Sequence, residues 1–130
     1  ENAKVYFTRE ITPENIIKAY EALGKKLEGK IAVKMHSGEQ GNPNYLRPEF
    51  VKDVVNYVNG PVVECNTAYE GARNTTEKHQ KLIEEHEWNK YFPFDLLDAE
   101  GPDMVLTIPE GEVLKENYVE KNMFKIKEEL

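Results

Sequence analysis

Short apolar segments alternate with amphipathic segments of helical length between residues 4 and 87, and this alternation is what most restricts the fold. Three of the apolar segments, at residues 4–8 (KVYFT), 30–35 (KIAVKM) and 61–65 (PVVEC), are rich in β-branched and aromatic residues, which is typical of short strands. Strands that alternate with helices of about ten or more residues form a mainly parallel sheet covered by helices. The sequence therefore predicts an α/β fold with a β-α-β-α-β-α core.

The amphipathic segments begin at residues that favour helix starts. Proline suits the first helical position, and short polar side chains suit the cap before it. The start signals are Thr12 with Pro13, then Pro48, and then Asn74 with Glu77, a pair that has the spacing of a capping box. The first helix is expected to end near Gly29 and the second near Gly60.

Beyond Trp88 the pattern loosens. The segments at residues 92–97, 104–108 and 113–119 are separated by proline and glycine, and they are predicted as short C-terminal strands with a hairpin among them. We treat the 130 residues as a single α/β domain. The chain lacks an initiating methionine and stops on KIKEEL, so two expectations stay open. One is a processed terminus with a final surface helix, and the other is a fragment or the first part of a longer protein.

The charge balance argues against two classes of partner. The chain has 24 acidic and 17 basic residues, a formal net charge of −7, whereas nucleic acids and anionic membranes favour a basic surface. We therefore expect no nucleic acid and no membrane partner. No apolar run reaches the roughly 18 residues that a membrane span requires. The single cysteine, Cys65, excludes a disulfide framework and an iron–sulfur cluster ligand motif within these residues, which fits a reducing cytoplasm.

Polar residues crowd at the ends of the predicted strands, above all in the loop KMHSGEQGNPNYLRP from residue 34 to 48. In open parallel sheets, ligands bind outside the carboxyl ends of the strands. Because alternate residues of a strand share a face, Lys34 and His36 are expected to emerge together. The residues expected to face a common crevice are Arg9, Lys34, His36, Glu39, Arg47, Glu64, Cys65, Asn66, Thr67, Tyr69 and Arg73.

One chemistry for this crevice is the binding of a small anionic ligand. Gly38 and Gly41 would let backbone N–H groups approach an oxyanion, and the helix start at Pro48 would add its positive dipole end. The loop lacks the lysine and hydroxyl of a phosphate-binding P-loop. The predicted ligand-binding residues are Lys34, Arg47 and Arg73 as cations, with Asn66 and Tyr69 as orienting groups.

Two further chemistries involve the same strand ends. His36, Glu39, Glu64 and Cys65 are residue types that bind zinc or iron, so a metal ion is a candidate cofactor, with His36, Glu64 and Cys65 as its ligands. Alternatively, His36 and Glu39 act as catalytic proton-transfer groups, or Cys65 is a nucleophile assisted by His36. The sequence leaves these alternatives open.

Other polar and aromatic residues are given structural interpretations. The histidines at positions 79 and 86 lie two turns apart on the third predicted helix and are expected to be surface or packing residues. The aromatic residues Trp88, Tyr91, Phe92 and Phe94 are typical of a core or an interface.

The two runs IAVKMHSGEQGNPNYLRPEFV and ECNTAYEGARNTTEKH resemble the uncharacterised iron–sulfur centre proteins known as domain of unknown function 362. The matching positions are Lys34, His36, Gly38, Glu39, Gly41, Tyr45, Leu46, Arg47, Pro48, Glu49, Phe50, Asn66, Thr67, Tyr69, Gly71, Arg73, Asn74 and His79. The chain departs from the family at Glu64 and Cys65, where relatives tend to have aspartate and threonine. The resemblance implies an α/β domain that in many relatives continues into a second half and a ferredoxin-like module that binds iron–sulfur clusters.

Two hypotheses of function follow. The first is a cytoplasmic ligand- or metal-binding domain of a redox-associated protein, with its polar crevice at the C-terminal ends of the strands. The alternative is a non-catalytic interaction or dimerisation module, in which the segment at residues 88–94 and the charged tail dock a partner domain or a second copy in a homodimer.

Overall fold

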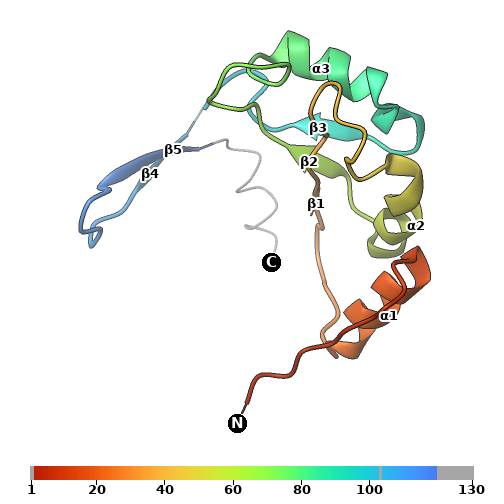
Figure 1. Cartoon of the computed structure of the whole chain (residues 1–130). Coiled ribbons are helices and arrows are strands. Elements are labelled where there is room, and N and C mark those ends of the chain that lie inside the picture. Colours follow the sequence, from red (N-terminus) through yellow and green to blue (C-terminus); the bar gives the residue numbers. More distant parts are fainter. Residues whose placement is uncertain (1, 103, 120–130) are drawn as a thin grey trace.

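The computed structural model describes residues 2–102 and 104–119, and it confirms the α/β fold class (Figure 1). Among these residues the strands form a parallel three-stranded sheet in the order β1-β2-β3 and a separate antiparallel hairpin, β4-β5. The elements are α1 (Pro13–Ala22), β1 (Val33–Lys34), α2 (Pro48–Val58), β2 (Val62–Glu64), α3 (Thr76–Glu85), a 3-10 turn (Trp88–Lys90), β3 (Phe94–Leu96), β4 (Met104–Thr107) and β5 (Glu116–Val119).

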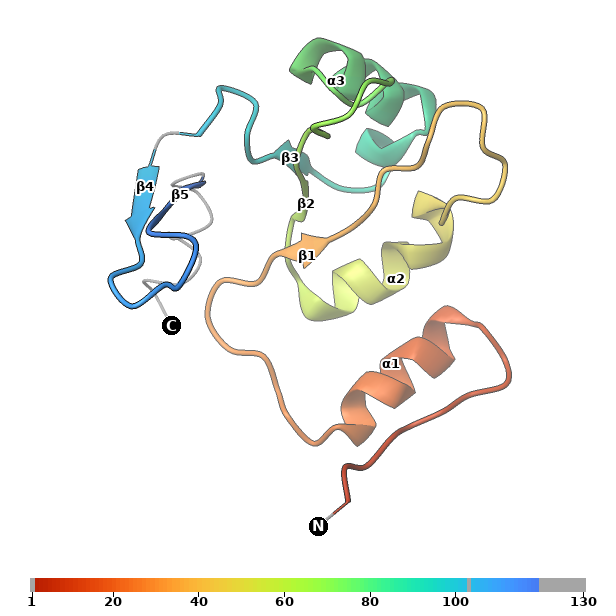
Figure 2. The same ribbon diagram turned by 60° about the vertical axis from the view of Figure 1, so that its left-hand side comes forward.

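The core lies between the parallel sheet and the two helices that flank it. Figures 1 and 2 both show α2 and α3 on one side of the sheet and the β4-β5 hairpin on the other. The central strand β2 is buried throughout, as is usual for parallel strands that are covered on both faces. The buried apolar cluster comprises Val51, Val55, Val62, Ile83, Trp88, Phe92 and Leu96.

Helix α2 follows the sequence prediction closely. Pro48 occupies its first turn, Val51 and Val55 are one helical repeat apart and buried, and Asn59 ends the helix in the left-handed conformation. The chain then passes close to β1 at Gly60, where an added Cβ would lie 2.4 Å from the carbonyl oxygen of Ile31. Only glycine fits at this crossing, so the connection from α2 to β2 is fixed by the sequence.

The prediction of a first strand at residues 4–8 is wrong. These residues are assigned to no strand, and Val5 and Phe7 are 88% and 82% exposed. The third strand of the sheet is instead β3, which pairs with β2 and brings Leu96 into the core. Strand propensity is a local property, whereas pairing goes to the segment that buries more apolar surface against the sheet.

The first helix is also shorter than predicted, because it ends at Ala22 rather than near Gly29. Gly24 adopts a φ of 67°, a left-handed conformation that stops the helical path. No residue of α1 is buried, so extending the helix would bury little additional apolar surface.

The cap of α3 differs from the predicted capping box. The N-cap is Thr75, whose side chain accepts a hydrogen bond from the Lys78 backbone N–H at 3.3 Å. Asn74 instead donates to the Glu70 carboxylate at 2.9 Å. Thr75, one position later, caps the helix with its hydroxyl oxygen, which leaves the Asn74 side chain free of the capping role and able to contact Glu70.

The C-terminal strands and the hairpin among them are confirmed. The segments at residues 92–97, 104–108 and 113–119 contain β3, β4 and β5, and β4 pairs antiparallel with β5. The predicted final surface helix lies outside the described residues. Within the described part of the chain, no helix has the length and apolar character needed to cross a membrane.

Candidate functional site

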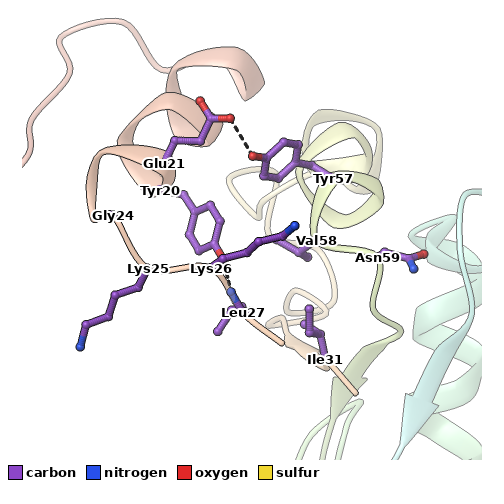
Figure 3. Close-up of a pocket in the computed structure, with 10 residues that line it drawn as sticks. All are labelled: Tyr20, Glu21, Gly24, Lys25, Lys26, Leu27, Ile31, Tyr57, Val58 and Asn59. Carbon is purple, nitrogen blue, oxygen red and sulfur yellow. Dashed lines mark hydrogen bonds between the residues drawn. The ribbon is translucent and has the colours of Figure 1, made fainter. Parts of the chain in front are cut away.

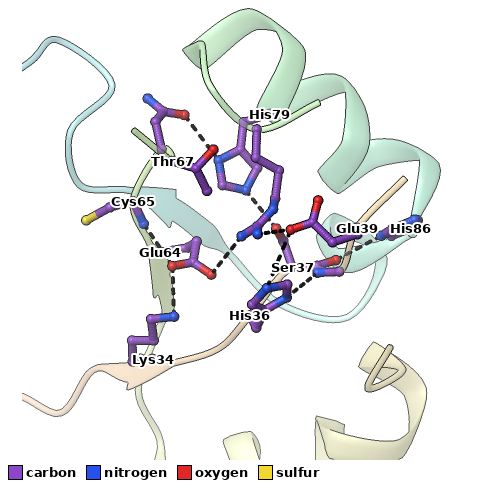
Figure 4. A network of polar contacts seen from close by, with 12 residues as sticks. Lys34, His36, Ser37, Glu39, Glu64, Cys65, Thr67, His79 and His86 are labelled. Carbon is purple, nitrogen blue, oxygen red and sulfur yellow. Dashed lines mark hydrogen bonds and ion pairs between the residues drawn. The ribbon is translucent and has the colours of Figure 1, made fainter. Parts of the chain in front are cut away.

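Polar side chains from β1, β2, their following loops and α3 converge at the C-terminal edge of the parallel sheet (Figure 4). The alternation predicted for the second strand is confirmed, because Val33 and Met35 pack against the core while Lys34 and His36 are exposed. The Nζ atom of Lys34 lies 2.9 Å from Oε1 of Glu64, the last residue of β2. Strand periodicity thus brings a cation and a carboxylate from neighbouring strands into contact.

A cluster of ionised groups surrounds Arg73. Its guanidinium donates to Oε1 of Glu39 and, at 2.6 Å, to the hydroxyl of Tyr69, which itself donates to Glu39 at 2.9 Å. The hydrogen bond from Arg73 lowers the pKa of Glu39 from its ordinary value, and the hydrogen bond to Glu39 raises the pKa of Tyr69. The loop after β1 is therefore tied to the loop after β2 by charge-assisted hydrogen bonds.

The same cluster contains two polar atoms whose bonding is incomplete. The side chains of Glu64 and Arg73 are only 6% and 4% exposed, and Oε2 of Glu64 lies 3.9 Å from a terminal nitrogen of Arg73. Within the described residues, neither this Oε2 nor Nε of Arg73 has a hydrogen-bond partner. Buried polar groups are nearly always hydrogen-bonded, so this pair is an exception inside the candidate site.

A directional chain of hydrogen bonds runs beside the cluster through Ser37, His79 and Asn66. Thr76 donates to the carbonyl of Ala99 at 2.9 Å, so its hydroxyl oxygen accepts from the amide nitrogen of Asn66 at 3.0 Å. The amide oxygen of Asn66 then accepts from Nδ1 of His79 at 3.1 Å, and Nε2 of His79 accepts from the Ser37 hydroxyl at 2.7 Å. Nε2 accepts in the neutral imidazole, which is the form favoured here because burial lowers the pKa of His79 below its ordinary value.

The charge state of His79 makes stability depend on pH. Burial is the main cause that lowers its pKa below the ordinary value of 6.5, with Arg73 adding to the effect and Glu64 and Asp98 opposing it. A depressed folded-state pKa means that its stabilisation is complete above pH 6.5 and is lost as the pH falls through the folded-state value. We expect urea denaturation curves to show the free energy of unfolding decreasing below pH 6.5 more steeply in the natural chain than in His79→Gln. Equal slopes in the two proteins would contradict this role.

The backbone of the loop after β1 is also held in place, by side chains from the end of α3 and the segment after it. The carbonyl oxygen of Ser37 accepts hydrogen bonds from Nδ1 of His86 at 2.8 Å and from the indole N–H of Trp88 at 2.9 Å. Gly38 follows with a φ of 97°, and an added Cβ would lie 2.8 Å from the ring of Tyr45. Tyr45 stacks on His86 with ring centroids 4.0 Å apart. The sharp turn at Gly38 is therefore fixed by packing as well as by hydrogen bonds.

This turn borders a cavity of about 280 Å³, which we call the loop cavity. Its lining residues are Met35, His36, Gly38, Glu39, Asn42, Asn44, Tyr45 and Leu46. The next residue, Arg47, is exposed, and its guanidinium lies 4.1 Å from the centroid of the Tyr45 ring. Arg47 is also the N-cap of α2, where no side chain caps the helix. The loop cavity thus lies beside an exposed guanidinium and a helix N-terminus.

The other predicted site residues are placed differently from one another. Asn66 lies in the hydrogen-bond chain, and Thr67 closes its own loop through a 2.8 Å bond from its backbone N–H to the carbonyl of Arg73. Cys65 is half-buried, and Figure 4 shows its sulfur pointing away from the Glu64 carboxylate. Arg9 does not reach this edge. Its segment runs beside α1, at the opposite end of the molecule (Figures 1 and 2).

The predicted metal ligands are not gathered into one group. In residues 2–102 and 104–119, no set of three or more histidine, cysteine, aspartate or glutamate side chains is placed to hold a metal ion. His36 lies 3.9 Å from Glu39, while Glu64 is occupied by Lys34 and by the Cys65 backbone N–H. The metal prediction therefore gains no support from the described residues, and proton transfer by His36 and Glu39 stays a prediction.

Sequence reasoning missed several residues that build this site. His79, expected to be a surface or packing residue, is fully buried as a packing residue, but its hydrogen bonds within the site were not predicted. Asp98 was not predicted either, and it accepts the backbone N–H of Asn66 through both carboxylate oxygens at 2.9 Å. Asp98 lies just after β3, so the strand end that joins the site is that of β3 and not the end of residues 4–8. The apolar neighbours Leu82 and Ile83 on the same helix were the available signal that His79 faces inward.

The aromatic segment is part of the core. Trp88 is 0% exposed and Phe92 is 7% exposed, and Tyr91 and Phe94 pack against the same cluster. Of the two interpretations given to them, the core is the one that the structure confirms.

Comparison with known proteins confirms the family resemblance. Residues 31–127 match the family described as Domain of unknown function (DUF362), a range that contains both motif runs and the whole polar cluster. No curated protein and no solved structure matches the chain. The family match covers most of the 130 residues, and its description assigns no reaction. On this match, the chain belongs to the DUF362 family of domains of unknown function.

Proposed function

We propose that this chain is a ligand-binding domain that takes a small anionic ligand into the loop cavity at the C-terminal edge of its parallel sheet. The observation that carries the proposal is the position of this cavity, between the turn at Gly38 and the start of α2. Helix N-termini favour anions, because their unpaired backbone N–H groups and the helix dipole both point at the ligand.

The charges of the neighbouring side chains support an anion. Lys34, Arg47 and Arg73 are three cations, and they are opposed by the carboxylates of Glu39 and Glu64. The two carboxylates already pair with Lys34 and Arg73. The exposed guanidinium of Arg47 donates to a neutral group, the carbonyl of Pro43, at 3.0 Å, so its charge can meet a ligand. On a chain of net charge −7, an anion would have to be held by particular donors and not by general attraction to the surface.

The resemblance of the sequence motifs supports a proposal for the role, the location and the partners of this domain. Relatives with iron–sulfur modules support a redox-associated role, with His36 and Glu39 as the proton-transfer groups nearest the cavity. The single cysteine supports a cytoplasmic location. A ferredoxin-like module or a second half would be a partner outside these 130 residues.

Inorganic phosphate is the probe that tests this proposal. In an NMR titration we expect saturable shifts of the backbone amides of residues 38–41 and of the first turn of α2. Arg47→Met should weaken phosphate binding by about tenfold or more, because a hydrogen bond to a charged group contributes roughly 1.5–3 kcal/mol. His36→Ala should also weaken it, because His36 lines the cavity.

Lys52→Met is the matched control. Lys52 also lies over a tyrosine ring, 5.5 Å from the centroid of Tyr91, and it belongs to the same helix. Its replacement removes the same charge without touching the loop cavity, so phosphate binding should match that of the natural chain. Identical titration curves for Arg47→Met and Lys52→Met would overturn the proposed site.

A further inference from the structure

The hairpin formed by β4 and β5 is an element without a core of its own. Within residues 104–119 no side chain is buried, and Val105 lies directly opposite Tyr118 on a face where they are 47% and 66% exposed. A two-stranded hairpin is at best marginally stable in water unless a further surface covers it. The hairpin is therefore suited to pack against something else.

Two exposed aliphatic side chains lie at the end of the hairpin, which we call the hairpin tip (residues 110–116). Val113 and Leu114 are 90% and 61% exposed. The turn that presents them is well defined, because Ile108 N–H donates to Lys115 at 2.8 Å and Gly111 N–H donates to Ile108 at 3.1 Å. Around these two residues the tip carries the acids Glu110, Glu112 and Glu116 and the single base Lys115.

A groove of complementary character lies at the other end of the molecule, between α1, α2 and the segment that leads into β1 (Figure 3). It is a cavity of about 670 Å³, which we call the basic groove. Its lining residues are Tyr20, Glu21, Gly24, Lys25, Lys26, Leu27, Ile31, Tyr57, Val58 and Asn59.

Two hydrogen bonds connect the elements that form the walls of the basic groove. Tyr57 donates to Glu21 at 2.7 Å, and the Leu27 backbone N–H donates to the Tyr20 hydroxyl at 3.1 Å. The apolar surface remains accessible, since Leu27 is 51% exposed and Tyr57 is 47% exposed. Figure 3 shows Lys26 extended across the groove, whereas the Lys25 side chain extends outward from the edge of the groove.

We propose that the hairpin tip of one copy docks in the basic groove of a second copy of this chain. Val113 and Leu114 would cover the exposed apolar wall, and the flanking glutamates would meet Lys25 and Lys26. Opposite charges around an apolar centre give both attraction and register at an interface. Figures 1 and 2 place the hairpin and α1 far apart in one chain, so a tip fills a groove between copies and not within one.

The geometry of this contact has a distinctive consequence. The tip and the groove are different surfaces, so each copy offers one of each and the interface is heterologous. Copies can therefore add head to tail, closing into a ring or continuing into a longer chain. When a charge swap is divided between two variants, neither variant matches itself. In a mixture the reversed tip matches the reversed groove and the natural tip matches the natural groove, so the two variants should add head to tail in strict alternation.

Analytical ultracentrifugation of the full chain with two charge-reversed variants tests the proposal. The natural chain is expected to associate with rising concentration, and less so at high salt. Lys25→Glu with Lys26→Glu reverses the groove, and Glu110→Lys with Glu112→Lys reverses the tip, so each double variant alone should sediment as a monomer. Mixed together, they should associate again, in equal proportions and as the natural chain does.

A third double variant serves as the control. Lys78→Glu with Lys81→Glu makes the same charge change on α3, away from both surfaces, and should associate like the natural chain. A natural chain that stays monomeric at every concentration would overturn the proposal. So would a groove variant that associates normally, or a mixture of the two variants that stays monomeric. The phosphate titration of the loop cavity is independent of these results.

Discussion

Replacing Arg73 with methionine is expected to lower the free energy of unfolding by about 3 kcal/mol. Removing one member of a buried ion pair costs roughly 3–5 kcal/mol, because the remaining charge is left buried without its partner. Arg73 is 4% exposed and contacts both Glu39 and Glu64. We expect the lower end of that range, since Glu64 keeps Lys34 as a partner and Glu39 is 41% exposed and can be solvated again.

Urea denaturation of the Arg73→Met protein measures this effect, and two further variants interpret it. Arg47→Met removes an exposed arginine and should change the free energy of unfolding by less than about 0.5 kcal/mol. In the double variant with Glu64→Gln, the loss should be smaller than the sum of the single losses, because the stranded charge is gone. Equal losses in Arg73→Met and Arg47→Met would show that the buried cluster does not stabilise the fold.

Replacing Trp88 with alanine is expected to lower the free energy of unfolding by about 3–5 kcal/mol, the usual loss for a large aromatic residue in a core. Trp88 is 0% exposed and contacts Phe92 and Phe94, with ring centroids 5.9 and 5.4 Å away. Its indole N–H also donates to the carbonyl of Ser37. The substitution therefore removes apolar contacts and one of the bonds that hold the site loop.

Circular dichroism during urea denaturation measures the effect without relying on tryptophan fluorescence. Trp88→Phe separates the two contributions, because it keeps most of the ring while removing the indole donor, and its loss should be clearly smaller. Tyr118→Ala, at a ring that is 66% exposed, serves as the surface control. A loss in Trp88→Ala no larger than that in Tyr118→Ala would contradict the placement of Trp88 in the core.

Arg73 and Trp88 both contact the loop after β1, so they connect the buried part of the protein to the candidate site. Trp88 and His86 hold the Ser37 carbonyl, and His79 holds the Ser37 hydroxyl, so the turn that borders the loop cavity is fixed from α3 and the segment after it. Arg73→Met and Trp88→Ala should therefore each change the NMR titration with phosphate as well as the free energy of unfolding. The loop is positioned by long-range contacts, which no local sequence pattern encodes.

The candidate site was predictable where strand periodicity decides which side chains emerge. Lys34 and His36 follow from the alternation of the second predicted strand, and the carboxyl-end rule places Glu64 beside them. The roles were less predictable. Lys34 and Arg73 were expected to meet a ligand, but they already pair with carboxylates of the chain, a contact between strands that are far apart in sequence.

By itself, the sequence determined the α/β class, the first turn of α2 and the family, because propensity, proline position and motif spacing act over a few residues. The tertiary structure decided which apolar segment joins the sheet. Residues 4–8 and β3 are both strand-like locally, but the segment that contains β3 also carries Leu96 into the core beside Trp88. It likewise decided that His79 is buried and neutral, since burial and hydrogen-bond partners come from α3, the loops and the segment after β3 together.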